Sequence, residues 1–173
     1  MKLKPGFLAF LTFGVLAFCL SGTAGAQNSV DAPDWKESEV PSPPAFDVSK
    51  LVIFEVAASS SLVYGVDPAS IRITHSDGVV RYVMVATSAS GATNVMYVGL
   101  RCSTGEFKTY ARYSADGHWS AASQPEWRSL FGNMPSKHAL RFAQAGGCDN
   151  ATAPSSVRVL VSRLKNQNFK IAE

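Results

Sequence analysis

The sequence predicts a single α+β domain in which a mostly antiparallel β-sheet is followed by two or three helices toward the C-terminus. Three observations support this fold class. The chain has 173 residues, 46% hydrophobic and 17% charged, which is enough for one globular core and too apolar for a disordered chain. Between residues 51 and 114, short apolar runs alternate with turn residues, as in antiparallel strands. After residue 123, apolar residues recur at helical spacing.

The first 26 residues are predicted to be a signal peptide. Two lysines precede an uncharged stretch, 7–20, whose 14 residues are too few to span a bilayer. The small residues at 24–26 (Ala-Gly-Ala) predict cleavage before Gln27, and no transmembrane segment is expected in the mature chain. The alternatives are an uncleaved anchor and a lipoprotein attached through Cys19, although Phe18 stands where lipid-attachment sites have a small residue. We therefore expect a periplasmic protein.

The mature chain is predicted to be nearly neutral. The full sequence has a formal charge of +3, and removal of the two lysines of the signal peptide leaves 14 Lys and Arg against 13 Asp and Glu, a net charge of +1. Such a balance indicates neither nucleic acid nor acidic lipid as a partner.

Cleavage also decides which cysteines remain. Cys19 leaves with the signal peptide, so Cys102 and Cys148 form an even pair in a chain sent to an oxidising compartment. The sequence therefore predicts one disulfide between them. Free thiols or a two-thiol metal site are the alternatives, but the three histidines do not have the spacing of metal ligands.

Residues 27–47 are predicted to form an extended arm. Four prolines among charged residues leave neither helical nor strand periodicity in this segment. Trp35 and Phe46 are isolated aromatic residues here, and we expect them to attach the arm to the body of the protein. The folded domain itself would then occupy 48–173.

Six strands are expected after the arm, because apolar and β-branched runs are separated by turn residues. They are 51–57, 62–66, 71–74, 79–87, 94–102 and 106–114. Asp77-Gly78 is a strong turn signal before the fourth strand, and Asp116-Gly117 closes the sixth. Since the last three strands are joined by short turns, they are expected to be antiparallel neighbours.

Helical signals follow in the last third of the chain. A capping box at 123–126 (Ser-Gln-Pro-Glu) predicts a short helix that continues to Phe131. A second helix is expected at 136–145, where two glycines would end it. In 155–166 the apolar spacing favours a C-terminal helix, but the β-branched residues of 157–161 leave a strand as the alternative.

The sequence contains no recognisable enzyme motif. A P-loop, a dinucleotide fingerprint, a zinc-protease motif and a nucleophile elbow are all missing from it. His75 and His118 could form an acid–base pair, with Lys108 or Arg112 as a phosphate ligand, as in a metal-free hydrolase or nuclease. The simpler interpretation, which the sequence favours, is that His118 belongs to a turn that is followed by Trp119 packing on the sheet. No cofactor or metal is predicted.

Strand parity predicts one candidate ligand-binding surface. Successive side chains of a strand alternate between the two faces of a sheet, and the apolar sets of the last three strands leave cations and aromatic residues on the opposite face. This set consists of Arg81, Tyr97, Arg101, Lys108, Tyr110 and Arg112. Charge-assisted hydrogen bonds and ring stacking would suit an anionic glycan or a protein partner. A solvated sheet face, or the bed of a helix, is the alternative.

Six short segments follow one another in unbroken order: 66–71 (VDPASI), 77–82 (DGVVRY), 90–95 (SGATNV), 99–102 (GLRC), 108–111 (KTYA) and 116–119 (DGHW). In these segments, over about residues 34–150, the chain resembles the cryptic neisserial protein-like family. The resemblance implies a secreted or lipid-anchored envelope protein of Gram-negative bacteria, and its two cysteines agree with the disulfide. It supplies no catalytic residue. The lipid box around Cys19 and the glycines of 145–148 depart from the family pattern.

Together these features predict an exported, non-enzymatic binding or structural module of the cell envelope. Its partner would be an anionic glycan or an envelope protein held by the cationic and aromatic sheet face. A small hydrolase or nuclease that uses His118 is the alternative.

Overall fold

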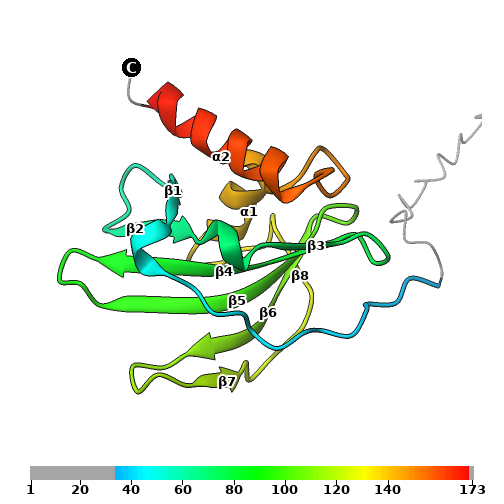
Figure 1. The fold of residues 1–173 in the computed structure, drawn as a ribbon, viewed down its shortest axis with the longest axis horizontal. Coiled ribbons are helices and arrows are strands. Elements are labelled where there is room, and N and C mark those ends of the chain that lie inside the picture. Colours follow the sequence, from blue (N-terminus) through cyan, green and yellow to red (C-terminus); the bar gives the residue numbers. More distant parts are fainter. Residues whose placement is uncertain (1–33, 172–173) are drawn as a thin grey trace, which may run out of the picture.

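An antiparallel sheet forms the centre of the computed structural model, which describes residues 34–171 (Figure 1). Within that part of the chain, eight strands follow the order β1-β2-β4-β5-β6-β7, with β3 beside β4 and β8 beside β6. Their bounds are β1 Val52–Phe54, β2 Leu62–Val66, β3 Arg72–Thr74, β4 Val79–Ser88, β5 Thr93–Arg101, β6 Glu106–Tyr113, β7 Trp119–Ala121 and β8 Arg128–Ser129. The predicted fold class is confirmed.

The meander of β4, β5 and β6 is the largest part of the sheet. Val79 pairs with Arg101 and Thr87 with Thr93, so β4 and β5 are antiparallel over their whole length. Gly78 precedes β4 with a φ of +69°, a backbone conformation that glycine adopts without the steric cost of a side chain. The three long strands predicted from alternation and turn residues are therefore confirmed.

Two helices lie together on one side of the sheet (Figure 1). α1 (His138–Phe142) continues into the π-helical turn η3 (Ala143–Gly147), and α2 (Val157–Ile171) follows. The ring of Phe142 stacks on Tyr82 of β4 at 4.0 Å between centroids, and Leu160 of α2 is fully buried in the same core. The C-terminal helix is thus confirmed over the strand alternative. No helix within residues 34–171 is both long and apolar enough to cross a membrane.

The helix predicted from the capping box at 123–126 is wrong. Residues 123–126 form neither helix nor strand, and Arg128 and Ser129 form β8 by pairing with Phe107 and Glu106 at the edge of β6. An isolated helix of about two turns is marginal because its nucleation is costly, and one cap contributes only about 1 kcal/mol. The open edge of β6 offers backbone partners, so tertiary pairing prevails over the local signal.

The predicted disulfide is confirmed. Cys102, which follows β5, is bonded to Cys148, which follows η3, with 5.7 Å between their Cα atoms. The bond therefore links the sheet to the helical layer. It closes a loop between two cysteines that are 46 residues apart in the sequence.

The arm covers the other side of the sheet. Residues 34–47 contain neither helix nor strand, and Figure 1 shows this blue segment running across β5 and β6 to the short 3-10 helix η1 (Val48–Lys50). Phe46 packs edge-on against Tyr113 and Trp119, with centroids 5.2 and 6.0 Å apart. The expectation that Phe46 and Trp35 attach the arm is confirmed. The predicted signal peptide, 1–26, and the first residues of the predicted arm lie outside the described residues.

Candidate functional site

Five of the six residues predicted for the candidate surface lie together on the sheet face opposite α1 and α2, which we call the arm-side face. They are Arg81, Tyr97, Arg101, Lys108 and Tyr110. The strand register explains this grouping, because Arg81 of β4 and Lys108 of β6 both lie opposite Gly99 of β5. Parity along these strands therefore predicted the correct face for these five residues.

The sixth residue, Arg112, lies on the opposite face. The register between β5 and β6 shifts by one residue, since Tyr97 pairs with Ala111 but Val98 pairs with Thr109. Tyr110 is the extra residue of this bulge, and every side chain after it changes face. The guanidinium of Arg112 donates to the sulfur of Met96 at 3.0 Å on the helix side. Its predicted place on the candidate surface is therefore wrong.

Much of the arm-side face is covered and has no contact with solvent. Arg81, Tyr97 and Arg101 are 0%, 1% and 6% exposed, although two of the three carry a full charge. The arm lies across them, with Trp35 and Glu37 directed at the face. The sheet thus has two covered faces, and whether the arm-side face also binds a partner stays a prediction.

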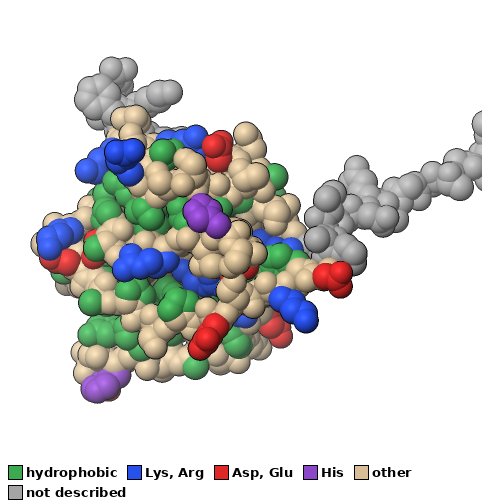
Figure 2. All heavy atoms as spheres, turned by 45° about the vertical axis from the view of Figure 1, so that its right-hand side comes forward, with side chains coloured by type: hydrophobic (Ala, Val, Ile, Leu, Met, Phe, Trp, Pro, Cys, Tyr) green, Lys and Arg blue, Asp and Glu red, His purple; other side chains and the backbone are tan. Residues whose placement is uncertain are grey.

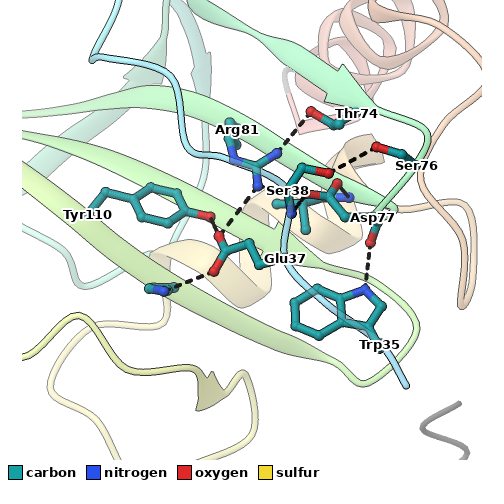
Figure 3. A network of polar contacts seen from close by, with 10 residues as sticks. Trp35, Glu37, Ser38, Thr74, Ser76, Asp77, Arg81 and Tyr110 are labelled. Atoms are coloured by element: carbon teal, nitrogen blue, oxygen red, sulfur yellow. Dashed lines mark hydrogen bonds and ion pairs between the residues drawn. The ribbon is translucent and has the colours of Figure 1, made fainter. Parts of the chain in front are cut away.

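Glu37 is the central acceptor of this contact (Figure 3). Its carboxylate accepts hydrogen bonds from Lys108 Nζ at 2.9 Å and Tyr110 Oη at 2.5 Å, and Arg81 Nη2 lies 3.4 Å away. Burial raises the pKa of Glu37, but these hydrogen bonds and the charges of Lys108 and Arg81 lower it to a net value below the ordinary one. The side chain is therefore an anion held by three donors.

Asp77 completes the charge balance around Arg81. Arg81 Nη2 donates to Asp77 Oδ2 at 2.8 Å, and Arg81 Nη1 donates to the hydroxyl of Thr74 at 2.9 Å (Figure 3). The backbone N–H of Ser38 in the arm donates to the same Asp77 oxygen at 3.0 Å. Burial raises the pKa of Asp77, while the Arg81 hydrogen bond and two backbone donors lower it overall. A buried cation next to two carboxylates is what allows the arm to dock here.

Trp35 covers the second buried cation. The guanidinium of Arg101 lies 3.6 Å from the centroid of the Trp35 ring, within the range of a cation–π contact. The indole N–H donates to the carbonyl oxygen of Asp77 at 2.9 Å, and the ring meets Trp127 edge-on at 5.9 Å. The side chain of Trp127, in the segment wrongly predicted as a helix, therefore extends the binding surface for the arm.

Gly99 is where the fold makes room for Tyr110. A Cβ atom at this position would lie 2.2 Å from the Tyr110 hydroxyl, so any other residue would push the phenol away. Because Gly99 has no side chain, the Tyr110 ring can cross β5 and reach Glu37. The pKa of Tyr110 is raised by its burial and by the Glu37 hydrogen bond, so the hydroxyl remains a donor.

Sequence reasoning missed Glu37, Ser38 and Asp77 as members of the site. Asp77 was interpreted as a turn residue, which is also correct, since its Oδ1 accepts from the backbone N–H of Val79 at 3.0 Å. Glu37 lies two residues from Trp35, so in an extended chain both side chains point to the same side. That spacing is the signal that could have indicated a docking segment.

The two histidines of the alternative enzyme hypothesis lie at opposite ends of the sheet. His75 follows β3 and lies next to Val79 at the start of β4, whereas His118 follows β6, whose end is level with Val85. Six residues of strand correspond to about 20 Å. The side chain of His118 is 81% exposed and is 3.7 Å from Asp116 in the same turn. The predicted acid–base pair does not form.

The described residues contain no group of three or more side chains that could hold a metal ion. Lys and Arg side chains on the face shown in Figure 2 lie in several separate places among hydrophobic and uncharged side chains. A cavity of about 810 Å³ lies elsewhere, next to Cys148 and between Phe131 and Arg163 of α2. The arm-side face differs from these other surfaces because the arm is docked on it, and it therefore remains the candidate site.

Comparison with protein families agrees with this architecture. A family model described as the CNP1-like family matches residues 30–165, which include the described part of the arm, the whole sheet and both cysteines of the disulfide. Comparisons with curated proteins and with solved structures gave no significant match. Since the family model spans well over half of the sequence, the chain belongs to the CNP1-like family.

Proposed function

We propose that the protein is an exported, non-enzymatic binding module of the cell envelope whose arm-side face holds an acidic, extended segment of a protein partner. The observation that carries this proposal is the contact of the face with Glu37 of its own arm, through Lys108, Tyr110 and Arg81. The docked segment of the arm thus shows the kind of ligand that we propose for this face.

The contacts of the arm favour a peptide over a glycan as the partner. The arm uses a backbone N–H, that of Ser38, as well as the side chains of Trp35 and Glu37. An aromatic residue and an acidic residue two positions apart in an extended segment would reproduce these contacts. Three donors around one carboxylate make the acidic residue the main determinant of specificity.

Only part of the arm has to leave for a partner to bind. The anchor around Phe46 is separate from the Trp35–Ser38 contacts, because it packs on Tyr113 and Trp119 at the other end of β6. Chain segments with few buried apolar contacts open locally at a lower free energy than the whole domain. A partner segment can therefore replace Trp35–Ser38 while residues near Phe46 keep the arm attached.

Export is supported by two independent features. The N-terminal pattern of 1–26 is typical of a signal peptide, and the bond between Cys102 and Cys148 is of a kind that persists in oxidising compartments.

A competition experiment tests the binding proposal. The probe is a fluorescent peptide with the sequence of residues 34–42, titrated into the full mature protein and followed by anisotropy. Glu37→Gln weakens the contact between the protein's own arm and the arm-side face. The peptide should therefore bind to this variant about tenfold more tightly than to the wild type, a change equivalent to about 1.4 kcal/mol. High salt should reduce this binding, because partly exposed charges are screened.

Two variants control the experiment. Glu39→Gln removes an exposed charge from the same arm and should leave peptide affinity at the wild-type value. Glu37→Gln combined with Lys108→Gln should lose the gain, since the face then lacks a main donor. If Glu37→Gln lowers the free energy of unfolding without raising peptide affinity, the contact is purely structural and the proposal is overturned.

A further inference from the structure

Two buried donors beneath the arm have no acceptor. Within the part of the chain that the structure describes, the Tyr97 hydroxyl and Arg81 Nε have no hydrogen-bond partner, although both side chains are essentially fully buried. Buried polar groups in native proteins are nearly always paired, because an unpaired one costs about 1–3 kcal/mol. Arg81 Nε can only donate and the Tyr97 hydroxyl can donate, so an acceptor would satisfy either group.

A cleft of about 530 Å³ lies next to Tyr97, between the arm and β3. Its volume is in the range of small-molecule sites. The arm contributes Pro41, Ser42 and Pro44, and the sheet side contributes Arg72, Ile73, Thr74, His75 and Tyr97. The pyrrolidine rings and Ile73 form apolar walls, whereas the remaining side chains are polar or cationic.

The charge of this cleft is positive. Arg72 is fixed at its rim, because its Nη1 donates to the carbonyl oxygens of Ala69 and Ile71 at 2.8 and 2.9 Å. Burial raises the pKa of Tyr97, whereas the positive charges of Arg81 and Arg72 lower it. Among the described residues that line the cleft, none is acidic.

We propose that this cleft binds a sugar acid through its carboxylate. The Tyr97 hydroxyl donates a hydrogen bond to the carboxylate, and the positive charge of Arg72 balances its negative charge. The apolar walls from Pro41, Pro44 and Ile73 contact the faces of the ring. The carboxylate supplies the acceptor that the buried hydroxyl lacks, and the bond is charge-assisted. This site is separate from the Trp35–Ser38 contacts, because a different part of the arm forms its wall.

Calorimetric titration of the full mature protein tests this site. The probes are glucuronate and galacturonate, and glucose is the neutral control. Inorganic phosphate tests whether the cleft binds any small oxyanion. A uronate should bind, glucose should not, and affinity should fall as salt is raised. Tyr97→Phe should weaken uronate binding about tenfold, because it removes one charge-assisted hydrogen bond. Arg72→Gln should weaken it as well.

Tyr82→Phe is the matched control. Its hydroxyl is also buried without a partner among the described residues, but Tyr82 lies in the core on the helix side of the sheet. It should leave uronate affinity unchanged. Without ligand, Tyr97→Phe should keep or raise the wild-type melting temperature, since it removes an unpaired buried hydroxyl and no hydrogen bond is lost. The proposal is overturned if no uronate binds, if phosphate binds more tightly than the uronates, or if Tyr97→Phe and Arg72→Gln both keep wild-type affinity.

Discussion

His138 should make the stability of this protein fall sharply in mild acid. The side chain is 7% exposed at the start of α1, where its ring stacks on Tyr64 and meets Phe107 edge-on. Its Nδ1 lies 3.3 Å from the hydroxyl of Ser136. Burial, together with the nearby charge of Arg112, lowers the pKa of His138 from 6.5 to about 4. The folded protein therefore holds this histidine neutral.

The direction of the pH dependence follows from this difference. Because the folded pKa is depressed, the unfolded chain binds the proton first as the pH falls below about 6.5, and the folded state loses stability. A difference from 6.5 to about 4 corresponds to about 3 kcal/mol when protonation is complete, and about 2 kcal/mol of it is lost between about pH 7 and pH 5. Glu37 and Asp77 have lowered pKa values, so their contribution to stability is lost only at more acidic pH.

Urea unfolding followed by tryptophan fluorescence at several pH values measures this loss. His138→Phe keeps an aromatic ring in the stack and removes the proton-binding site, so its stability should change little over the same pH range. The same substitution at His118, whose side chain is exposed, should keep the full pH dependence of the wild type. The reasoning is refuted if the wild type is equally stable at both pH values, or if His138→Phe retains the dependence.

Three further predictions concern the bond, the bulge and the N-terminus. Replacing Cys102 and Cys148 by Ala should lower the free energy of unfolding by about 4 kcal/mol in a urea titration, and finding free thiols in the native exported protein would contradict the bond. Gly99→Ala should displace Tyr110 and cost about 1–3 kcal/mol by thermal unfolding, whereas unchanged stability would show that the phenol can move freely. The intact mass of the exported protein should correspond to a chain that begins at Gln27, and an N-terminal lipid-modified cysteine would disprove this cleavage.

The regular parts of the fold could be predicted because their signals are local. β2 was predicted with its observed bounds, Leu62–Val66, and the long strands were placed within one or two residues. Alternation along a strand and turn residues such as Asp77-Gly78 depend only on neighbours in the sequence. The helix predicted at 123–131 failed because its competitor, the edge of β6, is distant in the sequence.

The candidate site was predicted only in part, for two physical reasons. Parity identified the cations and tyrosines of the arm-side face, but the bulge at Tyr110 reversed the side of Arg112. A bulge inserts one residue without a reliable sequence signal, so its effect on the following residues is visible only in the paired strands. The docking of the arm against Arg81 and Arg101 was also not predictable, since it depends on contacts between residues more than 40 positions apart.

The sequence by itself determined the fold class, the strand order of the meander, the disulfide partners and the attachment of the arm by Trp35 and Phe46, because each follows from local pattern or from counting. Only the tertiary structure decided that the arm-side face is covered and that Glu37 is its acceptor. The physical reason is that burying Arg81 requires carboxylates from two separate segments, Glu37 in the arm and Asp77 in a turn, and only the folded chain brings them to one guanidinium.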